Sequence, residues 1–168
     1  MLTITWCPGE VPTDLPITQV YGILFDDRGR ILLKVEEKSR GLVFGLAGGT
    51  PEDFDSDRVA TLRRELLEEV NVTMGDEVLL VGYQRIEGDG DRPPYAQVRM
   101  AAVISEIGER RPDPDTGEIY RRLLCSPERA ITLLGWGEVA KKQICRAVEI
   151  ATRQLFVPPC RDSEEMWI

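Results

Sequence analysis

Residues 48 to 72 read GGTPEDFDSDRVATLRRELLEEVNV, and this stretch decides most of what the sequence predicts. Two glycines and an acidic loop come first. A helix is then predicted from about residue 57 to 70, because the apolar residues recur at the spacing of one helix face. Those residues are Val59, Leu62, Leu66 and Val70. One of the polar residues at 55 to 57 can cap the first turn, where acidic side chains suit the helix dipole.

Three glutamates of this helix share one face beside the apolar stripe. Glu65, Glu68 and Glu69 stand at positions i, i+3 and i+4, so they are neighbours on the helix surface. Like charges so placed cost about 0.2–0.5 kcal/mol per pair unless water or a cation offsets them. Mg²⁺ prefers such oxygen ligands, and Arg64 is placed to hold the carboxylates in one geometry. A solvated charged face produces the same pattern, so the hexapeptide alone leaves both interpretations open.

Composition narrows the class of protein. The 168 residues suit one domain, with an N-terminal arm at 1–16 that has room for one short strand and an irregular tail at 157–168. A net charge of −8 disfavours nucleic acid as a partner. We expect a cytoplasmic protein without a membrane partner, because no apolar run could span a bilayer and the N-terminus lacks a secretory signal.

The sequence contains no histidine, which excludes Ser-His-Asp and Cys-His nucleophilic schemes and histidine-bound zinc. A general base must therefore be a carboxylate, lysine, tyrosine, thiol or metal-bound hydroxide. The four cysteines are widely spaced without a C-x-x-C pair, so we expect free thiols rather than disulfides or a zinc site. Carboxylates with a hard metal are the chemistry that the composition supplies best.

Strand patterns surround the acidic helix and a second long helix at 137–155. Residues 19–25 and 30–35 flank a glycine-containing turn, which predicts a hairpin. Further strands are expected near 42–46, 78–85, 96–107 and 120–125, with a short helix at 126–134. Strands before, between and after two main helices indicate a mixed α/β (α+β) fold.

The stretch from Gly48 to Val72 resembles the Nudix box, whose pattern is G-x5-E-x7-R-E-U-x-E-E-x-G-U with U an aliphatic residue. Gly49 matches the leading glycine. The second half of the pattern is matched by Arg64, Glu65, Leu66, Glu68, Glu69 and Val72. The resemblance extends loosely over residues 17–155 and implies a Nudix-type α/β/α sandwich with a mixed sheet.

Three positions depart from that pattern. Asp55 stands where the first glutamate is expected, and the loop before Arg64 has one extra residue, so the role of Asp55 stays open. Asn71 replaces the last glycine; since Asn tolerates the left-handed conformation next best, we predict a positive φ at the end of the helix. Ala47 replaces a frequent proline, which affects the loop more than the chemistry.

The resemblance implies a Mg²⁺-dependent pyrophosphohydrolase, with Mn²⁺ able to substitute, that cleaves a nucleoside diphosphate linked to another moiety. Carried over by position, Glu68 and Glu69 would be the principal metal ligands, and the Gly49 backbone would approach the metal or phosphate closely. Glu65 would bind metal or act as base toward the attacking water, and Arg64 would orient this set. Weaker candidates for the substrate are Gly48, Arg85, Arg99 and Arg121. Glu52, Glu106, Glu109 and Glu118 are possible additional ligands or bases.

Two questions stay open at the level of sequence. A catalytically silent Nudix domain that senses a nucleotide or an ADP-ribose-like ligand is the alternative function. Within the enzyme interpretation the small-molecule nucleotide substrate is not specified, because specificity in this family lies outside the box. A homodimer through the arm or a sheet edge is also possible.

Overall fold

A mixed β-sheet organises the chain in the computed structural model, which describes residues 1–161 and 163–168. Its order is β1-β6-β7-β2-β3-β8-β9, with β4 added to β3 and β5 to β2. The strands are β1 Thr3–Pro8, β2 Ile17–Phe25, β3 Ile31–Lys38, β4 Gly41–Gly45, β5 Ala47–Gly49, β6 Val72–Glu87, β7 Tyr95–Ile107, β8 Arg121–Cys125 and β9 Met166–Trp167. Only β2 and β7 pair in parallel among these strands.

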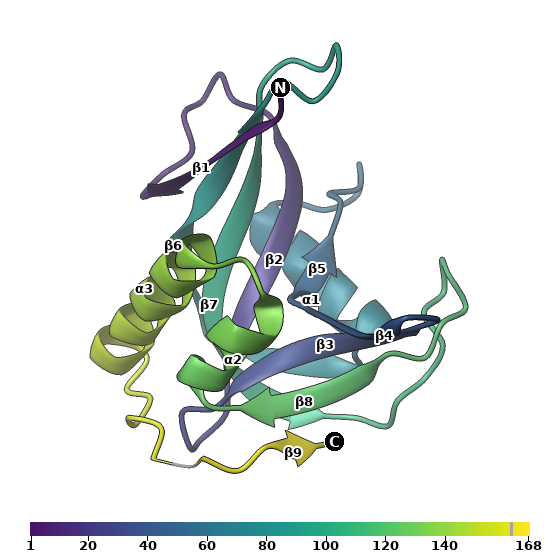
Figure 1. The fold of residues 1–168 in the computed structure, drawn as a ribbon, viewed down its shortest axis with the longest axis vertical. Helices are drawn as coiled ribbons and strands as arrows, with labels where there is room; N and C mark the ends of the chain where they lie inside the picture. Colours follow the sequence, from purple (N-terminus) through teal and green to yellow (C-terminus); the bar gives the residue numbers. More distant parts are fainter. Residues whose placement is uncertain (162) are drawn as a thin grey trace.

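Helices cover both faces of this sheet, as Figure 1 shows. One face carries α1 (Arg58–Glu69), and the other carries α2 (Pro127–Leu134) and α3 (Glu138–Gln154). Leu62 and Leu66 of α1 belong to one buried cluster, whereas Ile144 and Ile150 of α3 belong to a second. The predicted α/β/α sandwich with two main helices and a mixed sheet is therefore confirmed, with α2 as the expected short third helix.

The predicted hairpin of β2 and β3 is wrong for most of its length. These strands pair only at Phe25 and Ile31. Around the turn, the Asp26 carboxylate accepts hydrogen bonds from the backbone amides of Arg28 and Arg30 and from Arg30 Nε. Beyond it β2 pairs with β7 and β5, and β3 pairs with β8 and β4. Periodicity identifies strands but not their partners, which are set by packing over long sequence separations.

Both chain ends add strands to the sheet. The N-terminal arm supplies β1, which pairs with β6 from Thr3 to Pro8 as the room for one strand allowed. The tail at 157–168 was expected to be irregular. Its residues 157–161 and 163–165 have no regular structure, but it ends in β9, which pairs with Leu123 and Leu124 of β8. Across residues 1–161 and 163–168, no helix combines the length and apolar character that crossing a bilayer requires.

Asn71 directly follows Val70, the C-cap residue of α1. Its φ of 47° confirms the predicted left-handed conformation. Its backbone carbonyl accepts a hydrogen bond from the Gly108 amide at 2.9 Å. Its side-chain Nδ2 donates to the Glu109 carbonyl at 2.7 Å. Asn71 therefore both turns the chain out of the helix and ties it to the end of β7.

Replacing Asn71 by alanine is expected to lower the free energy of unfolding by about 1–2 kcal/mol, because alanine pays the left-handed penalty. Asn71→Gly is the matched control. Glycine removes that penalty but also loses the bond to Glu109, so we expect a change within about 1 kcal/mol. Urea denaturation of the three proteins measures both values. An Asn71→Ala protein as stable as wild type would contradict this account of the helix end.

Candidate active site

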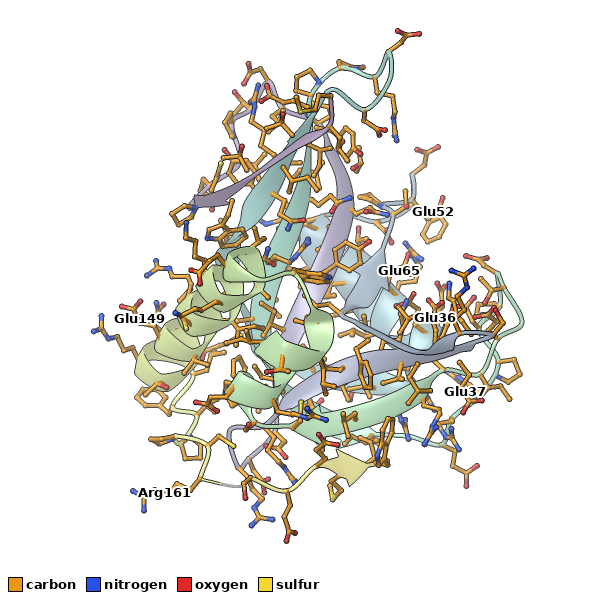
Figure 2. The ribbon with its side chains drawn as sticks, viewed as in Figure 1. Glu36, Glu37, Glu52, Glu65, Glu149 and Arg161 are labelled. Carbon is orange, nitrogen blue, oxygen red and sulfur yellow. The ribbon has the colours of Figure 1, made fainter. Side chains whose placement is uncertain are left out.

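The acidic helix α1 is fixed at its start and along one face. The Asp57 side chain caps it by accepting a hydrogen bond from the Ala60 amide at 2.8 Å. Thr61, Leu62 and Leu66 are buried against the sheet. This packing leaves the glutamates on the side of the helix that faces β5, where Figure 2 shows Glu65. The helical spacing predicted from the sequence thus places the carboxylates beside the two glycines of that strand.

Arg64 joins the carboxylates into one network. Its Nη1 donates to Glu65 Oε1 at 3.0 Å and to Glu68 Oε2 at 2.9 Å. Its Nε and Nη2 donate to the two carboxylate oxygens of Asp55 at 3.2 and 3.0 Å, and Nη2 also donates to the Thr50 carbonyl. Asp55 therefore accepts two hydrogen bonds from the guanidinium, one through each carboxylate oxygen. Although the loop has one extra residue, it brings the Asp55 carboxylate to Arg64. This answers the question about the role of Asp55 that the sequence pattern left open.

The environment of Asp55 has a consequence for acid stability. Hydrogen bonding from Arg64 lowers the pKa of Asp55 to about 2. A lowered folded-state pKa stabilises the protein above the unfolded pKa of about 4, and this contribution is lost as pH falls toward 2. Asp55→Asn is expected to lower the free energy of unfolding at pH 7 by about 1–3 kcal/mol, because Arg64 keeps its charge but loses one of its three carboxylate partners.

The measurement for Asp55→Asn is denaturant unfolding at several pH values. The difference from wild type is expected to shrink between about pH 4 and pH 2, as the wild-type carboxylate is protonated. Asp53→Asn is a matched control, because Asp53 is an exposed acid of the same loop. A constant difference across this pH range would show that the Asp55–Arg64 pair is not its source.

Glu69 is held separately from the Arg64 network. Lys34 Nζ in β3 donates to Glu69 Oε1 at 2.6 Å, and the Gly48 backbone amide donates to Oε2 at 2.9 Å. The Lys34 ammonium also lies 4.6 Å from the centre of the Tyr120 ring. Burial raises the pKa of Glu69, although Lys34 and the Gly48 amide act against this shift. Lys34 was missed from sequence, and the available signal was a lysine in the middle of the apolar strand ILLKV.

The two glycines of β5 serve different purposes. A side chain on Gly49 would begin 2.4–2.5 Å from the Glu65 carboxylate, so the missing Cβ makes room for that acid. Gly48 has a φ of 145°, and a Cβ there would lie 2.1 Å from the Val20 carbonyl oxygen. Glycine is thus required at both positions, at one for the carboxylate and at the other for the backbone.

The cluster has the donor chemistry of a hard divalent cation. Four carboxylates meet two cationic side chains, which leaves an excess of two negative charges when all are ionised; these residues are Asp55, Glu65, Glu68, Glu69, Arg64 and Lys34. The carboxylate oxygens and the net negative charge of the cluster fit Mg²⁺. Within the described residues, no three acidic or cysteine side chains converge on one point as metal ligands. Arg64 and Lys34 engage the carboxylates instead.

The other predicted arginines lie in different surroundings. Arg85 pairs with Glu87 and Arg121 with Glu37, each at 3.0 Å, so both form surface ion pairs rather than joining the glutamate cluster. Arg99 is only 3% exposed and lines a cavity that Lys34 of the cluster also lines. Of the three arginines named as substrate candidates, the structure brings only this one next to the site.

The additional acids named from the sequence are all exposed. They are Glu52, Glu106, Glu109 and Glu118. Figure 2 shows Glu52 at the tip of its loop, whereas Glu65 lies beside β5. None of the four forms a hydrogen bond or ion pair with Arg64 or Lys34 among the described residues. The cluster on α1 is completed by Asp55 rather than by these acids.

Comparison with known proteins agrees with this geometry. The NUDIX domain family model matches residues 16–147, and the chain therefore belongs to the Nudix hydrolase family, enzymes that act on phosphoric anhydride bonds. No curated protein sequence matches the chain significantly.

Solved structures share the fold at low sequence identity. A NUDIX hydrolase from Nitrosomonas europaea is 22% identical with a TM-score of 0.56, over 78% of this chain and 87% of that one. An Ap4A hydrolase from C. elegans is 15% identical with a TM-score of 0.55, over 81% and 98%. A Bacillus subtilis pyrophosphohydrolase is 16% identical with a TM-score of 0.53, over 65% and 64%.

Proposed function

We propose that this chain is a Mg²⁺-dependent pyrophosphohydrolase that cleaves a nucleoside diphosphate linked to another moiety. Water attacks a phosphorus of the pyrophosphate bridge, one P–O bond forms, and the bridging P–O bond breaks. The observation that carries the proposal is the Arg64 network, which gathers Glu65 and Glu68 beside Gly49 and next to Glu69. The names of the Bacillus subtilis pyrophosphohydrolase and the C. elegans Ap4A hydrolase support the same reaction class.

Glu65, Glu68 and Glu69 are the residues that would hold the cation, with the Gly49 backbone close by. A bound Mg²⁺ or Mn²⁺ neutralises charge on the phosphates and aligns the attacking water with the leaving group. Positioning and electrostatics dominate phosphoryl transfer, so little covalent chemistry is asked of the protein.

Glu65 is assigned as the base that takes the proton of the attacking water. Arg64 fixes the carboxylate of Glu65 through Oε1, and the side chain is 13% exposed, so its second oxygen has a defined position. Arg64 itself is a positioning residue, because its N–H groups already donate hydrogen bonds to Asp55, Glu65, Glu68 and Thr50. A cation fixed in this way cannot also neutralise the phosphates, which leaves that task to a bound metal.

Hydrolysis in ¹⁸O-labelled water tests the reaction type. ADP-ribose and nucleotide sugars of guanosine and uridine diphosphate are incubated with the protein and Mg²⁺, and products are analysed by mass spectrometry. One labelled oxygen is expected on a phosphate of one product, with none on ribose or base. Labelled oxygen in a ribose hydroxyl group would reveal cleavage of a C–O bond and would overturn the proposal.

A further inference from the structure

A cavity of about 460 Å³ opens on the face of the sheet that α3 covers, and Lys34, which binds Glu69 of α1, is one of its lining residues. Polar side chains from three adjacent strands line its floor, and Trp136 and Val139 from the α2–α3 segment line its wall. Lys34 and Tyr21 border the cavity, and Tyr21 pairs with Gly48 in the sheet register. A ligand in this cavity would therefore have its other end next to Gly48 and Glu69.

The floor consists of two neighbouring rows across the sheet. Gln97 of β7 lies opposite Gln19 of β2 and Gln84 of β6. Two residues along β7, Arg99 lies opposite Tyr21. Gln97 and Arg99 therefore point to the same face of one strand, as every second residue does. The register places one acceptor-bearing amide and one guanidinium side by side under the cavity.

Arg99 is buried without an acidic partner. Its Nε donates to Gln143 Oε1 at 2.9 Å, and its Nη2 donates to Gln84 Oε1 at 2.7 Å. Its Nη1 donates to the backbone carbonyls of Gln97 and Val98 at 3.3 and 3.4 Å. This leaves one N–H of Nη2 for a ligand, and no described carboxylate forms an ion pair with Arg99. The rings of Tyr21 and Trp136 lie 4.7 and 6.0 Å from the guanidinium carbon. Burial lowers the pKa of Arg99 to about 10, which leaves it charged at neutral pH.

Gln143 shows that this arrangement has a cost. The side chain is 1% exposed, and its Nε2 has no hydrogen-bond partner in the described structure. Its amide must present oxygen to Arg99, so its nitrogen stays unsatisfied, a cost that folded proteins generally avoid. Arg122 offers a contrast, because this buried arginine donates to the Val70 and Gly108 backbone carbonyls and closes the end of α1. Arg99 also donates to two backbone carbonyls, those of Gln97 and Val98, but at 3.3 and 3.4 Å and within its own strand, and it lines a cavity.

The amide of Gln97 supplies the complementary group. Its Nε2 donates to Gln19 Oε1 at 2.6 Å, so its own Oε1 remains as an acceptor at the cavity. A guanidinium can only donate, whereas this oxygen can only accept. Together they match the edge of a base that has a carbonyl beside a ring N–H. Adenine and cytosine place an amino donor and an unprotonated ring nitrogen on the corresponding edge.

We infer that the cavity receives the nucleobase of the substrate and selects oxo bases, of the guanine and uracil type, over the amino bases adenine and cytosine. This inference rests on the proposed function, because the phosphates attached to that nucleoside would reach the glutamate cluster. Arg99 donates to the base carbonyl, Gln97 accepts from the adjacent ring N–H, and Trp136 provides an aromatic surface. An amino base would direct its amino hydrogens at the Arg99 guanidinium and its unprotonated ring nitrogen at the Gln97 oxygen, so neither hydrogen bond could form.

Binding of mononucleotides tests the inference separately from hydrolysis. GMP, UMP, AMP and CMP are titrated by calorimetry into metal-free protein, so each pair compared carries the same phosphate. GMP is expected to bind at least roughly tenfold more tightly than AMP, and UMP more tightly than CMP, because an unpaired buried donor is costly. Equal affinities within both pairs would overturn the inference, even if the enzyme hydrolyses nucleotides.

Variants assign the preference to the two side chains. Gln97→Met and Arg99→Gln are each expected to reduce the ratio of GMP affinity to AMP affinity toward one. Arg146→Gln, on the exposed side of α3, is the control and should keep the wild-type ratio. Arg99 is buried, so Arg99→Gln can destabilise the fold. Gln97 is only partly buried, so Gln97→Met should fold and allow the binding test. An unchanged ratio in folded Gln97→Met would overturn the assignment. Inorganic phosphate displacing GMP from the cavity while GMP and AMP bind equally would show an anion site instead.

Discussion

Glu68→Gln is expected to lower kcat/KM by roughly 10²–10³-fold, which corresponds to about 3–4 kcal/mol of transition-state stabilisation. The substitution keeps the size of the side chain but removes the charge that would hold the cation. Glu68 is 27% exposed and its carboxylate contacts only Arg64 among the described ion pairs, so the fold should tolerate the change. Relief of repulsion within the acidic face acts in the same direction.

The control for Glu68→Gln is Glu149→Gln. Glu149 is an exposed glutamate on α3, which Figure 2 places away from Glu65, and it pairs with Arg146 and Arg153. This variant should retain the wild-type rate. Divalent-cation affinity, followed by Mn²⁺ electron paramagnetic resonance, should fall in Glu68→Gln and not in the control. Full activity of a folded Glu68→Gln protein would remove Glu68 from the metal site.

Glu69→Gln is expected to cause a similar loss of rate but, unlike Glu68→Gln, also a loss of stability. The Lys34–Glu69 pair is shielded, with side chains 14% and 11% exposed, and removing one member leaves an ammonium without its partner. At this position the loss of the ion pair with Lys34 therefore lowers stability by more than the relief of repulsion among the glutamates raises it. Lys34→Met combined with Glu69→Gln should restore stability without restoring activity. Recovery of the rate in the double variant would show that Glu69 acts only through Lys34.

Gly48→Ala and Gly49→Ala are expected to fail for different reasons. At Gly48 a Cβ would meet the Val20 carbonyl at 2.1 Å and the Tyr21 Cα at 2.7 Å in a positive-φ conformation, so we expect a loss of about 3 kcal/mol or more in unfolding free energy. At Gly49 the three atoms nearest to the Cβ would all belong to the carboxylate of Glu65, which can move. Gly49→Ala should therefore fold and lose activity.

The comparison of these two alanine variants separates backbone from side-chain requirements. Thermal unfolding should show a large decrease in Tm for Gly48→Ala and a small one for Gly49→Ala. The rate of Gly49→Ala should fall at least tenfold, because displacing a catalytic group by about 1 Å can cost 10²-fold. Gly45→Ala is a control in the same segment, since a Cβ there meets nothing within 4 Å. Wild-type activity in Gly49→Ala would show that the position of Glu65 is not critical.

The sequence predicted the acidic helix and its glycines because their signals are local. Helical spacing fixes the shared face of Glu65, Glu68 and Glu69, and the tolerance of Asn for positive φ predicted Asn71 correctly. The two cations that hold the carboxylates differ in this respect. Arg64 lies in the same helix and was identified, whereas Lys34 reaches Glu69 from a strand 35 residues earlier in the chain.

Features that depend on sheet register could not be predicted. The pairing of β2 with β7 brings Tyr21 beside Arg99 over a long sequence separation, and no periodicity specifies which strands become neighbours. For the same reason Arg99 could not be told apart from the surface arginines Arg85 and Arg121. The role of Asp55 needed the path of its loop, which carries the acid back to Arg64.

The most direct test of metal-dependent hydrolysis uses wild-type protein stripped of metal with a chelator. It is incubated with nucleoside triphosphates, ADP-ribose, dinucleotide cofactors and nucleotide sugars, with and without Mg²⁺ or Mn²⁺, and released phosphate or mononucleotide is measured. The account predicts turnover of at least one of these compounds that requires the added cation and is largely lost in Glu68→Gln. Tight nucleotide binding without turnover of any of them would contradict it and indicate a nucleotide sensor instead.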